Sequence, residues 1–136
     1  MENRLINKTI KEIKIASDKK AILFITDIEN VMAFAEGDCC SETWIEHMSI
    51  PKLPAQVIAV KNIDLNKDSL SNEEYECLQY YGLEIITNNG SIIIDYRNVS
   101  NGYYGGWLSW NEDDVYGGVF GQNVSNMKWK DVNNDF

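Results

Sequence analysis

The sequence predicts an α+β protein, with a mostly antiparallel β-sheet of six to seven strands and one short helix after the third strand. Three observations support this fold class. Short segments of alternating or continuous apolar residues recur along the chain, separated by turn residues, as is typical of strands. The apolar spacing becomes helical after Gly37. In addition, Asn89-Gly90 is a strong signal for a hairpin turn between two apolar segments.

The first third of the chain predicts an antiparallel meander. Residues 9–15 alternate isoleucine with charged residues, residues 21–26 form an apolar run, and residues 31–35 form a second one. Short polar turns at 18–20 and 27–30 separate these segments. Connections this short place consecutive strands side by side in antiparallel pairs.

The segment after the meander predicts the helix. Trp44, Ile45 and Met48 lie at positions i, i+1 and i+4, which share one face of a helix over residues 41–48. Asp38 is one candidate for its N-cap, because its carboxylate accepts hydrogen bonds from exposed backbone N–H groups. Prolines follow within two turns and end the helix.

The second half of the chain predicts the remaining strands. Residues 56–64 form a fourth strand, and residues 76–87 and 91–97 form a hairpin. Residues 106–110 form the last strand, with Trp107 and Ser109 on one face and Leu108 and Trp110 on the other.

We expect a single domain over residues 1–136, because this length suits one hydrophobic core. The apolar pattern weakens from residue 111, so residues 111–136 are interpreted as an extension that docks on the domain or on another subunit. The number of aromatic residues exceeds what one small core needs, and this favours a homo-oligomer.

The composition excludes several function classes. Twelve basic and 21 acidic side chains give a net charge of −9, which opposes general binding of nucleic acid. Acidity at this level mostly keeps a small protein soluble, and it would also suit a basic protein partner. We find no signal peptide and no apolar run long enough to span a membrane, so we expect a protein of the cytoplasm that makes no membrane contact.

Catalytic and metal chemistry find little support in the sequence. Cys40 and His47 would lie about 10 Å apart on the predicted helix, too far for a thiolate–imidazole pair. A zinc site lacks ligands, because the chain has three cysteines without a Cys-x-x-Cys motif and one histidine. Residues 64–75 begin like a calcium loop but lack its glycine and its final glutamate. We therefore expect no enzyme activity, no metal and no cofactor.

Two segments that are distant in the sequence, residues 37–44 and residues 100–107, suggest one ligand-binding site. Aromatic faces stack on nucleobases, a guanidinium binds phosphate, and asparagine and aspartate recognise base edges or ribose hydroxyls. Glycines around Tyr103 and Tyr104 would let the backbone approach a ligand closely. In the alternative interpretation, two of the aromatic residues fill the core and two cover an oligomer interface. The predicted ligand-binding residues are Asp38, Cys40, Trp44, Arg97, Asn101, Tyr103, Tyr104 and Trp107.

The order of these motifs resembles a family of small uncharacterised proteins that is common in bacteriophage and prophage genomes. The shared features are an N-terminal meander, the Asp-Cys-Cys segment 38–40 followed by Trp-Ile-Glu at 44–46, a hairpin around 90–94, and the Ser-Asn-Gly-Tyr-Tyr segment 100–104. The resemblance covers residues 7–110 and implies a phage origin, hence a location in the host cytoplasm. It carries no established activity.

Two functions remain open from the sequence. In the first, the chain is a non-enzymatic anti-defence protein that sequesters a nucleotide-type host immune signal, such as a cyclic nucleotide or a cyclic ADP-ribose derivative. It is similar to phage sequestering proteins in size, implied origin and lack of catalytic residues. In the alternative, the chain is an acidic protein–protein inhibitor of a host defence enzyme or nuclease.

Overall fold

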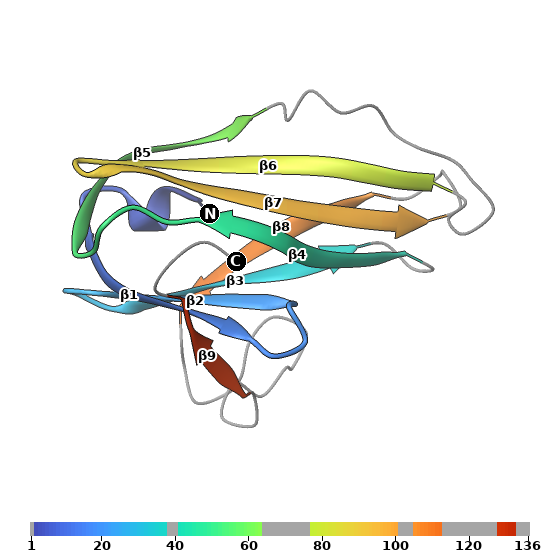
Figure 1. The fold of residues 1–136 in the computed structure, drawn as a ribbon, viewed down its shortest axis with the longest axis horizontal. Helices are drawn as coiled ribbons and strands as arrows, with labels where there is room; N and C mark the ends of the chain where they lie inside the picture. Colours follow the sequence, from blue (N-terminus) through green and yellow to red (C-terminus); the bar gives the residue numbers. More distant parts are fainter. Residues whose placement is uncertain (1, 38–40, 64–76, 101–104, 113–127, 133–136) are drawn as a thin grey trace.

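A computed structural model of the chain describes residues 2–37, 41–63, 77–100, 105–112 and 128–132. These residues form β-strands and one 3₁₀ turn (Figure 1). The elements are η1 (Glu2–Leu5), β1 (Thr9–Ala16), β2 (Ala21–Thr26), β3 (Asn30–Gly37), β4 (Glu42–Ser49), β5 (Ala55–Ile63), β6 (Cys77–Thr87), β7 (Gly90–Ser100), β8 (Gly106–Glu112) and β9 (Trp129–Asp131).

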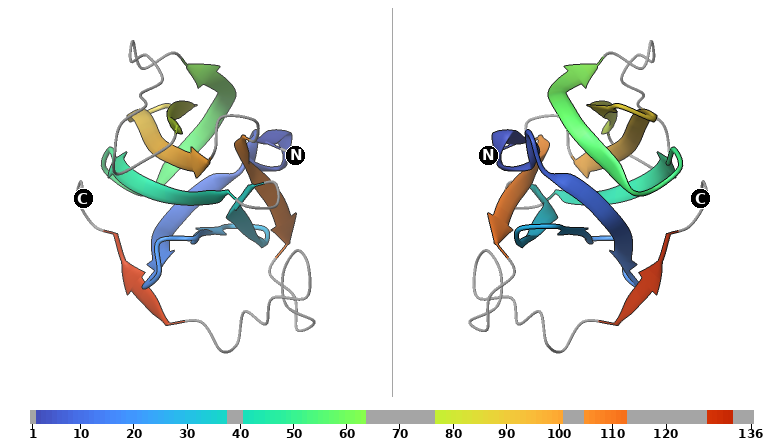
Figure 2. Two further views of the ribbon diagram at one scale, coloured as in Figure 1. Left: turned by 90° about the vertical axis from the view of Figure 1, so that its right-hand side faces the viewer. Right: turned by 90° about the vertical axis from the view of Figure 1, so that its left-hand side faces the viewer.

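All described strand pairs are antiparallel and belong to one sheet. The strand order is β4-β7-β6-β5-β1-β2-β3-β8, and β9 pairs with β1 outside this path. The sheet folds back on itself where β5 meets β1, since only Thr9–Gln56 and Ile10–Ala55 are paired there. Strands β5, β6, β7 and β4 therefore face β1, β2, β3 and β8 (Figures 1 and 2).

The larger hydrophobic core lies between these two halves and draws residues from both. Phe24 and Ile92, from opposite halves, are both fully buried in it, and Leu5 of η1 joins them. A smaller buried cluster that includes Met32 and Phe34 lies on the other face of β2 and β3. Trp129 of β9 packs against this second cluster.

The predicted meander is confirmed, because β1, β2 and β3 pair in sequence order. The hairpin predicted from residues 76–87 and 91–97 is also confirmed, since β6 pairs with β7. Thr87 pairs with Gly90 across its turn, and Gly90 has a φ of +123°, which favours glycine. The Asn89 side chain donates a 2.9 Å hydrogen bond to the Pro54 carbonyl, fixing the hairpin to the β4–β5 connection.

The α+β fold class is wrong, because residues 41–48 form no helix. Residues 42–49 are strand β4, which pairs with β7. A β-bulge between Ile45 and His47 explains the error. Thr43 and Ile45 face the core with a spacing of two, and the extra residue at the bulge then makes Met48 the next buried residue. This shift of phase imitates helical spacing, although threonine, isoleucine and tryptophan favour strands.

The sheet also has more strands than the six to seven expected. The described residues form eight strands along the main path, with β9 in addition. No helix among the described residues has the length and apolarity needed to cross a membrane.

Candidate functional site

The two segments of the predicted ligand site, residues 37–44 and 100–107, are flanked by strand ends that lie together at one end of the sheet. Strand β3 ends at Gly37 and strand β8 begins at Gly106, and these two glycines pair with each other. Glu42 at the start of β4 pairs with Val99 near the end of β7. We call this end of the molecule, on the right in Figure 1, the motif end.

Several predicted ligand-binding residues lie outside the described part of the chain, and their role stays a prediction. They are Asp38, Cys40, Asn101, Tyr103 and Tyr104. The structure does place Trp44, Arg97 and Trp107.

The interior of the sheet changes character toward the motif end. Along β7, Ile92, Ile94 and Tyr96 face the core at the spacing of two that a strand imposes. The next two residues on the same face are Asn98 and Ser100, which are also buried. The core is therefore apolar in the middle of the molecule and polar at the motif end.

Asn98 has a hydrogen-bonding group without a partner. Its Nδ2 donates to Thr43 Oγ1 at 2.9 Å, and the two residues are 0% and 2% exposed. Its Oδ1 is buried and accepts no hydrogen bond from any described residue. A buried acceptor that no protein donor pairs costs about 1–3 kcal/mol of folding free energy. A ligand N–H or O–H group reaching this oxygen would recover that energy.

Two stacked tyrosines support the polar interior. Tyr81 and Tyr96 have ring centroids 5.1 Å apart with an interplanar angle of 14°. The Tyr81 hydroxyl donates to Gln79 Oε1 at 2.9 Å and accepts from the Gly106 N–H at 3.3 Å. Tyr81 therefore holds the start of β8 against β6.

The glycines at the motif end allow the two halves of the sheet to approach each other. A Cβ atom on Gly106 would lie 2.2 Å from Thr43 Oγ1, and one on Gly37 would lie 2.9 Å from the same oxygen. Both Cβ positions would also lie 3.0 Å from Asn98 Nδ2. The glycines around Tyr103 and Tyr104 were expected to let a ligand approach the backbone. Gly106, which follows them, instead makes room for Thr43 and Asn98.

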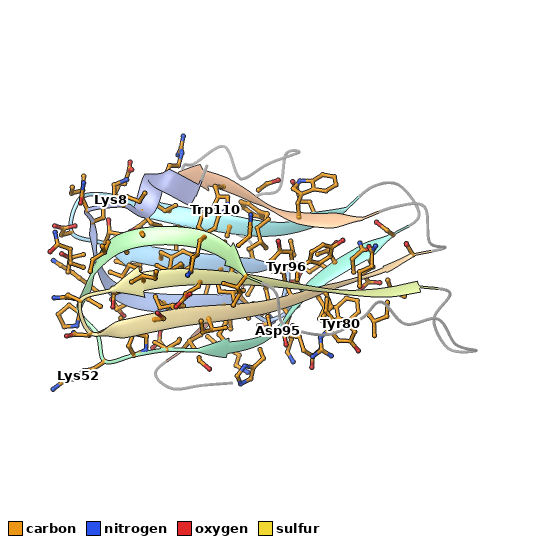
Figure 3. The ribbon with its side chains drawn as sticks, turned by 90° about the horizontal axis from the view of Figure 1, so that it is seen from above. Lys8, Lys52, Tyr80, Asp95, Tyr96 and Trp110 are labelled. Carbon is orange, nitrogen blue, oxygen red and sulfur yellow. The ribbon has the colours of Figure 1, made fainter. Side chains whose placement is uncertain are left out.

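Arg97 lies on the outer face of β7, next to aromatic residues of both neighbouring strands. Its Nε and Nη2 donate to the two carboxylate oxygens of Asp95 at 3.3 and 3.1 Å. Its guanidinium carbon lies 4.8 Å from the ring centroid of Tyr80 on β6, which Figure 3 shows near Asp95. Trp44 stands opposite Arg97 on β4 and donates to Glu46 Oε1 at 2.9 Å. We call these five residues the outer cluster.

The outer cluster has more carboxylates than basic groups, so its net charge is negative. Arg97 Nη1 lies 4.0 Å from Glu46 Oε1, so one guanidinium faces two carboxylates. Burial lowers the pKa of Arg97, but the hydrogen bond and charge of Asp95, together with Glu46, raise it above the ordinary arginine value. Arg97 stays charged at every pH near neutrality, and its fork-shaped donor set is engaged by Asp95. A phosphate at this position would compete with that carboxylate.

A shallow hollow of about 360 Å³ adjoins Trp44 at the edge of the outer cluster. The turn after β1 forms its other wall, where the Lys19 carbonyl accepts a 2.8 Å hydrogen bond from the Ile45 N–H. Asp18 and Glu42 also line the hollow, so its charged lining is mixed.

Trp107 lies apart from Trp44 and Arg97. It pairs with Glu36 of β3 and is 40% exposed on the outer face of β3 and β8, the half of the sheet opposite the outer cluster. Its Nε1 donates to Ser109 Oγ at 3.0 Å, and Ser109 in turn donates to Glu36 Oε2. The predicted sharing of faces along this strand is confirmed, since Leu108 and Trp110 pack on the core.

Residues 3–110 match the protein family described as "Domain of unknown function (DUF7448)". This match covers most of the chain. The chain belongs to this family. A viral relative, the uncharacterized protein L278 of Acanthamoeba polyphaga mimivirus, is 36% identical over 115 residues, covering 78% of this chain and 90% of that protein. No solved structure matches the chain. The DUF7448 match includes Thr43, Asn98 and the outer cluster, and it ends before β9.

Sequence reasoning missed the interior residues of this DUF7448 domain. Thr43 and Asn98 are brought together by the pairing of β4 with β7, which the predicted helix excluded. One signal was present. In the alternating run Ile92, Ile94, Tyr96, the next inward position is asparagine, a residue that is rarely buried unless it is hydrogen-bonded.

The expected separation of about 10 Å between Cys40 and His47 does not apply, because residues 42–49 form a strand and not a helix. His47 is an exposed residue of strand β4 opposite Asp95, and Cys40 lies outside the described residues. Among the residues that the structure describes, no group of three or more His, Cys, Asp or Glu side chains could hold a metal ion.

Proposed function

We propose that this chain is a non-enzymatic viral anti-defence protein that binds and sequesters a nucleotide-type host immune signal at the motif end. One observation carries the proposal: the buried Asn98 Oδ1 lacks a donor and lies in the polar part of the interior. An amide oxygen in this position accepts from an N–H group, and the exocyclic amine of a nucleobase is such a donor. Binding would therefore remove a defect that the free protein carries.

The remaining recognition groups of the proposed site come from the two motifs. Tyr103 and Tyr104 would stack on the base, while Asp38 would accept from an amine or a ribose hydroxyl, with Cys40 and Asn101 beside them. Because Arg97 is engaged by Asp95 and Glu46, we assign selectivity to the base and sugar of the ligand. Phosphate contacts fall in this proposal to backbone N–H groups.

The biological setting belongs to the same proposal. The relative from Acanthamoeba polyphaga mimivirus supports a viral protein family. The motif order leads us to place this member in a bacteriophage or prophage, acting in the cytoplasm of its host. The ligand would be a cyclic nucleotide or a cyclic ADP-ribose derivative, and homo-oligomers would present several such sites.

Mass spectrometry of bound small molecules tests this function. The protein is incubated with a mixed pool of cyclic nucleotides and ADP-ribose derivatives, washed and denatured by heat, and the released compounds are identified. We expect one species, unhydrolysed and depleted from the pool. The matching nucleoside, which lacks phosphate, should displace it at higher concentration if base and sugar recognition dominates. Release of a hydrolysed product, or of nothing, would contradict the proposal.

The outer cluster favours a second candidate function, an acidic inhibitor of a host defence enzyme or nuclease. Trp44, Tyr80 and Arg97 are residue types that dominate the energy of protein interfaces, and all three are partly exposed on one face. The excess carboxylate of the cluster and the net charge of −9 suit a basic partner.

The two candidates predict opposite results for two variants. Under the inhibitor interpretation, a target protein captured from the host and then purified should bind this chain more weakly at high salt. The target should also bind Trp44→Ala more weakly, whereas it should bind Asn98→Leu normally. Under the sequestration proposal, Asn98→Leu loses the nucleotide and Trp44→Ala retains it.

A further inference from the structure

We propose that a groove between β1, the β4–β5 connection and β9 is a second binding site, for a small organic anion that carries a phosphate or carboxylate group. The groove has a volume of about 510 Å³, which lies within the range of small-molecule pockets. It opens where β1 stops pairing with β5 at Ile10 and starts pairing with β9 at Lys14. A β-bulge in β1 between Ile10 and Glu12 adjoins this opening.

The walls of the groove are fixed by hydrogen bonds and an ion pair. The Val132 N–H donates to the Ile13 carbonyl at 2.8 Å, and Lys14 Nζ lies 3.2 Å from Asp131 Oδ1, so β9 is held against β1. On the opposite side, Asn89 Nδ2 donates to the Lys52 carbonyl at 3.2 Å. A site that is already formed spends little free energy on ordering when it binds a ligand.

The charges around the groove favour an anion. Lys11 and Lys52 are exposed and line it, and neither makes an ion pair with any described carboxylate. The lining carboxylates are Glu12 and Asp131, and Asp131 forms an ion pair with Lys14. Counting this third lysine, the described charges at the groove sum to +1 in a chain whose net charge is −9.

The ligand class follows from these groups. Ammonium groups bind phosphate and carboxylate as point charges, and the volume requires a molecule larger than the bare ion. Ile13 and Val132 contribute the buried apolar base of the groove. Lys52 projects from the end of the molecule away from Tyr80 (Figure 3), so the groove is separate from the motif end.

An NMR titration of the full chain tests this site residue by residue. Glucose 6-phosphate and citrate serve as separate anionic probes, and glucose is the uncharged control. We expect saturable amide shifts at residues 11–13, 50, 52, 53 and 131–132 with at least one anion and none with glucose. A response to one anion only would support the site and identify its head group.

Paired lysine variants separate the site from a general charge effect. Lys11→Gln/Lys52→Gln should weaken binding by about tenfold or more, because two charge-assisted contacts are lost. Lys20→Gln/Lys61→Gln removes the same charge away from the groove and should bind as the wild type does. Equal weakening in both double variants, or no saturable shift in the wild type up to about 10 mM anion, a concentration that only very weak binding would require, would overturn the proposal.

Discussion

Two neighbouring residues of β7, Arg97 and Asn98, face opposite sides of the sheet and differ in how fully their polar groups are used. Arg97 on the outer face donates to both oxygens of Asp95, approaches Glu46 and covers the ring of Tyr80. Asn98 on the inner face uses its Nδ2 and leaves its Oδ1 unpaired.

The difference shows that a charged side chain among aromatic residues is not by itself a ligand site. The guanidinium of Arg97 already interacts with Asp95, Glu46 and Tyr80, and these interactions hold β6, β7 and β4 together. The unpaired Oδ1 of Asn98 destabilises the folded state, because a buried acceptor has no donor. A group of this kind marks a place where a bound ligand can supply the missing hydrogen bond. The predictions below test this division between a structural outer face and a binding inner face.

The largest effect is expected from Gly106→Ala. Its new methyl group would lie 2.2 Å from Thr43 Oγ1, so the interior at the motif end must shift, and we expect a loss of about 2–3 kcal/mol in unfolding free energy. Urea denaturation measures this loss. Adding Thr43→Ala should restore part of the stability, whereas two additive losses would show that the predicted contact is not the cause.

A somewhat smaller loss is expected from Arg97→Ala, because the nearly buried carboxylate of Asp95 would lose the guanidinium that offsets its charge. Since both side chains retain some exposure, 21% and 12%, we expect about 2 kcal/mol rather than the larger cost of a fully buried pair. Arg97→Ala/Asp95→Ala should be more stable than the single variant in the same denaturation assay. If Arg97→Ala unfolds like the wild type, the outer cluster does not have the structural role assigned to it.

The interior pair should behave in the opposite way. Asn98→Leu/Thr43→Val replaces both hydrogen-bonding partners by apolar groups of similar shape, and we expect the unfolding free energy to change by no more than about 1 kcal/mol, including a gain. Ligand retention, measured by mass spectrometry, should be lost. A large loss of stability would mean that the pair serves folding.

The smallest effect is expected from Trp107→Ala. The side chain is partly exposed and its hydrogen bond to Ser109 is local, so stability should change by about 0.5 kcal/mol. Because Trp107 lies on the outer face of β3 and β8, away from the inner face that carries Asn98, ligand retention should be unchanged in an equilibrium binding assay. Loss of retention would place Trp107 back in the site.

The sequence was sufficient for the strands that alternate regularly and for the hairpin at Gly90. It was misleading at β4, where the bulge after Ile45 changes the phase of the pattern and makes Met48 fit a helix. That single error hid the pairing of β4 with β7, and with it the contact between Thr43 and Asn98. The engagement of Arg97 was also missed, although Asp95 lies two residues away on the same strand and Tyr80 lies opposite Arg97 across the predicted hairpin.

The most direct test of the account compares ligand retention by the wild type, Asn98→Leu and Arg97→Ala/Asp95→Ala after incubation with the same nucleotide pool. Circular dichroism on each sample confirms that it is folded. We expect the wild type and the outer-face variant to release the same unhydrolysed nucleotide after heating, and Asn98→Leu to release none. Retention by Asn98→Leu, together with loss in the outer-face variant, would contradict the assignment of binding to the inner face.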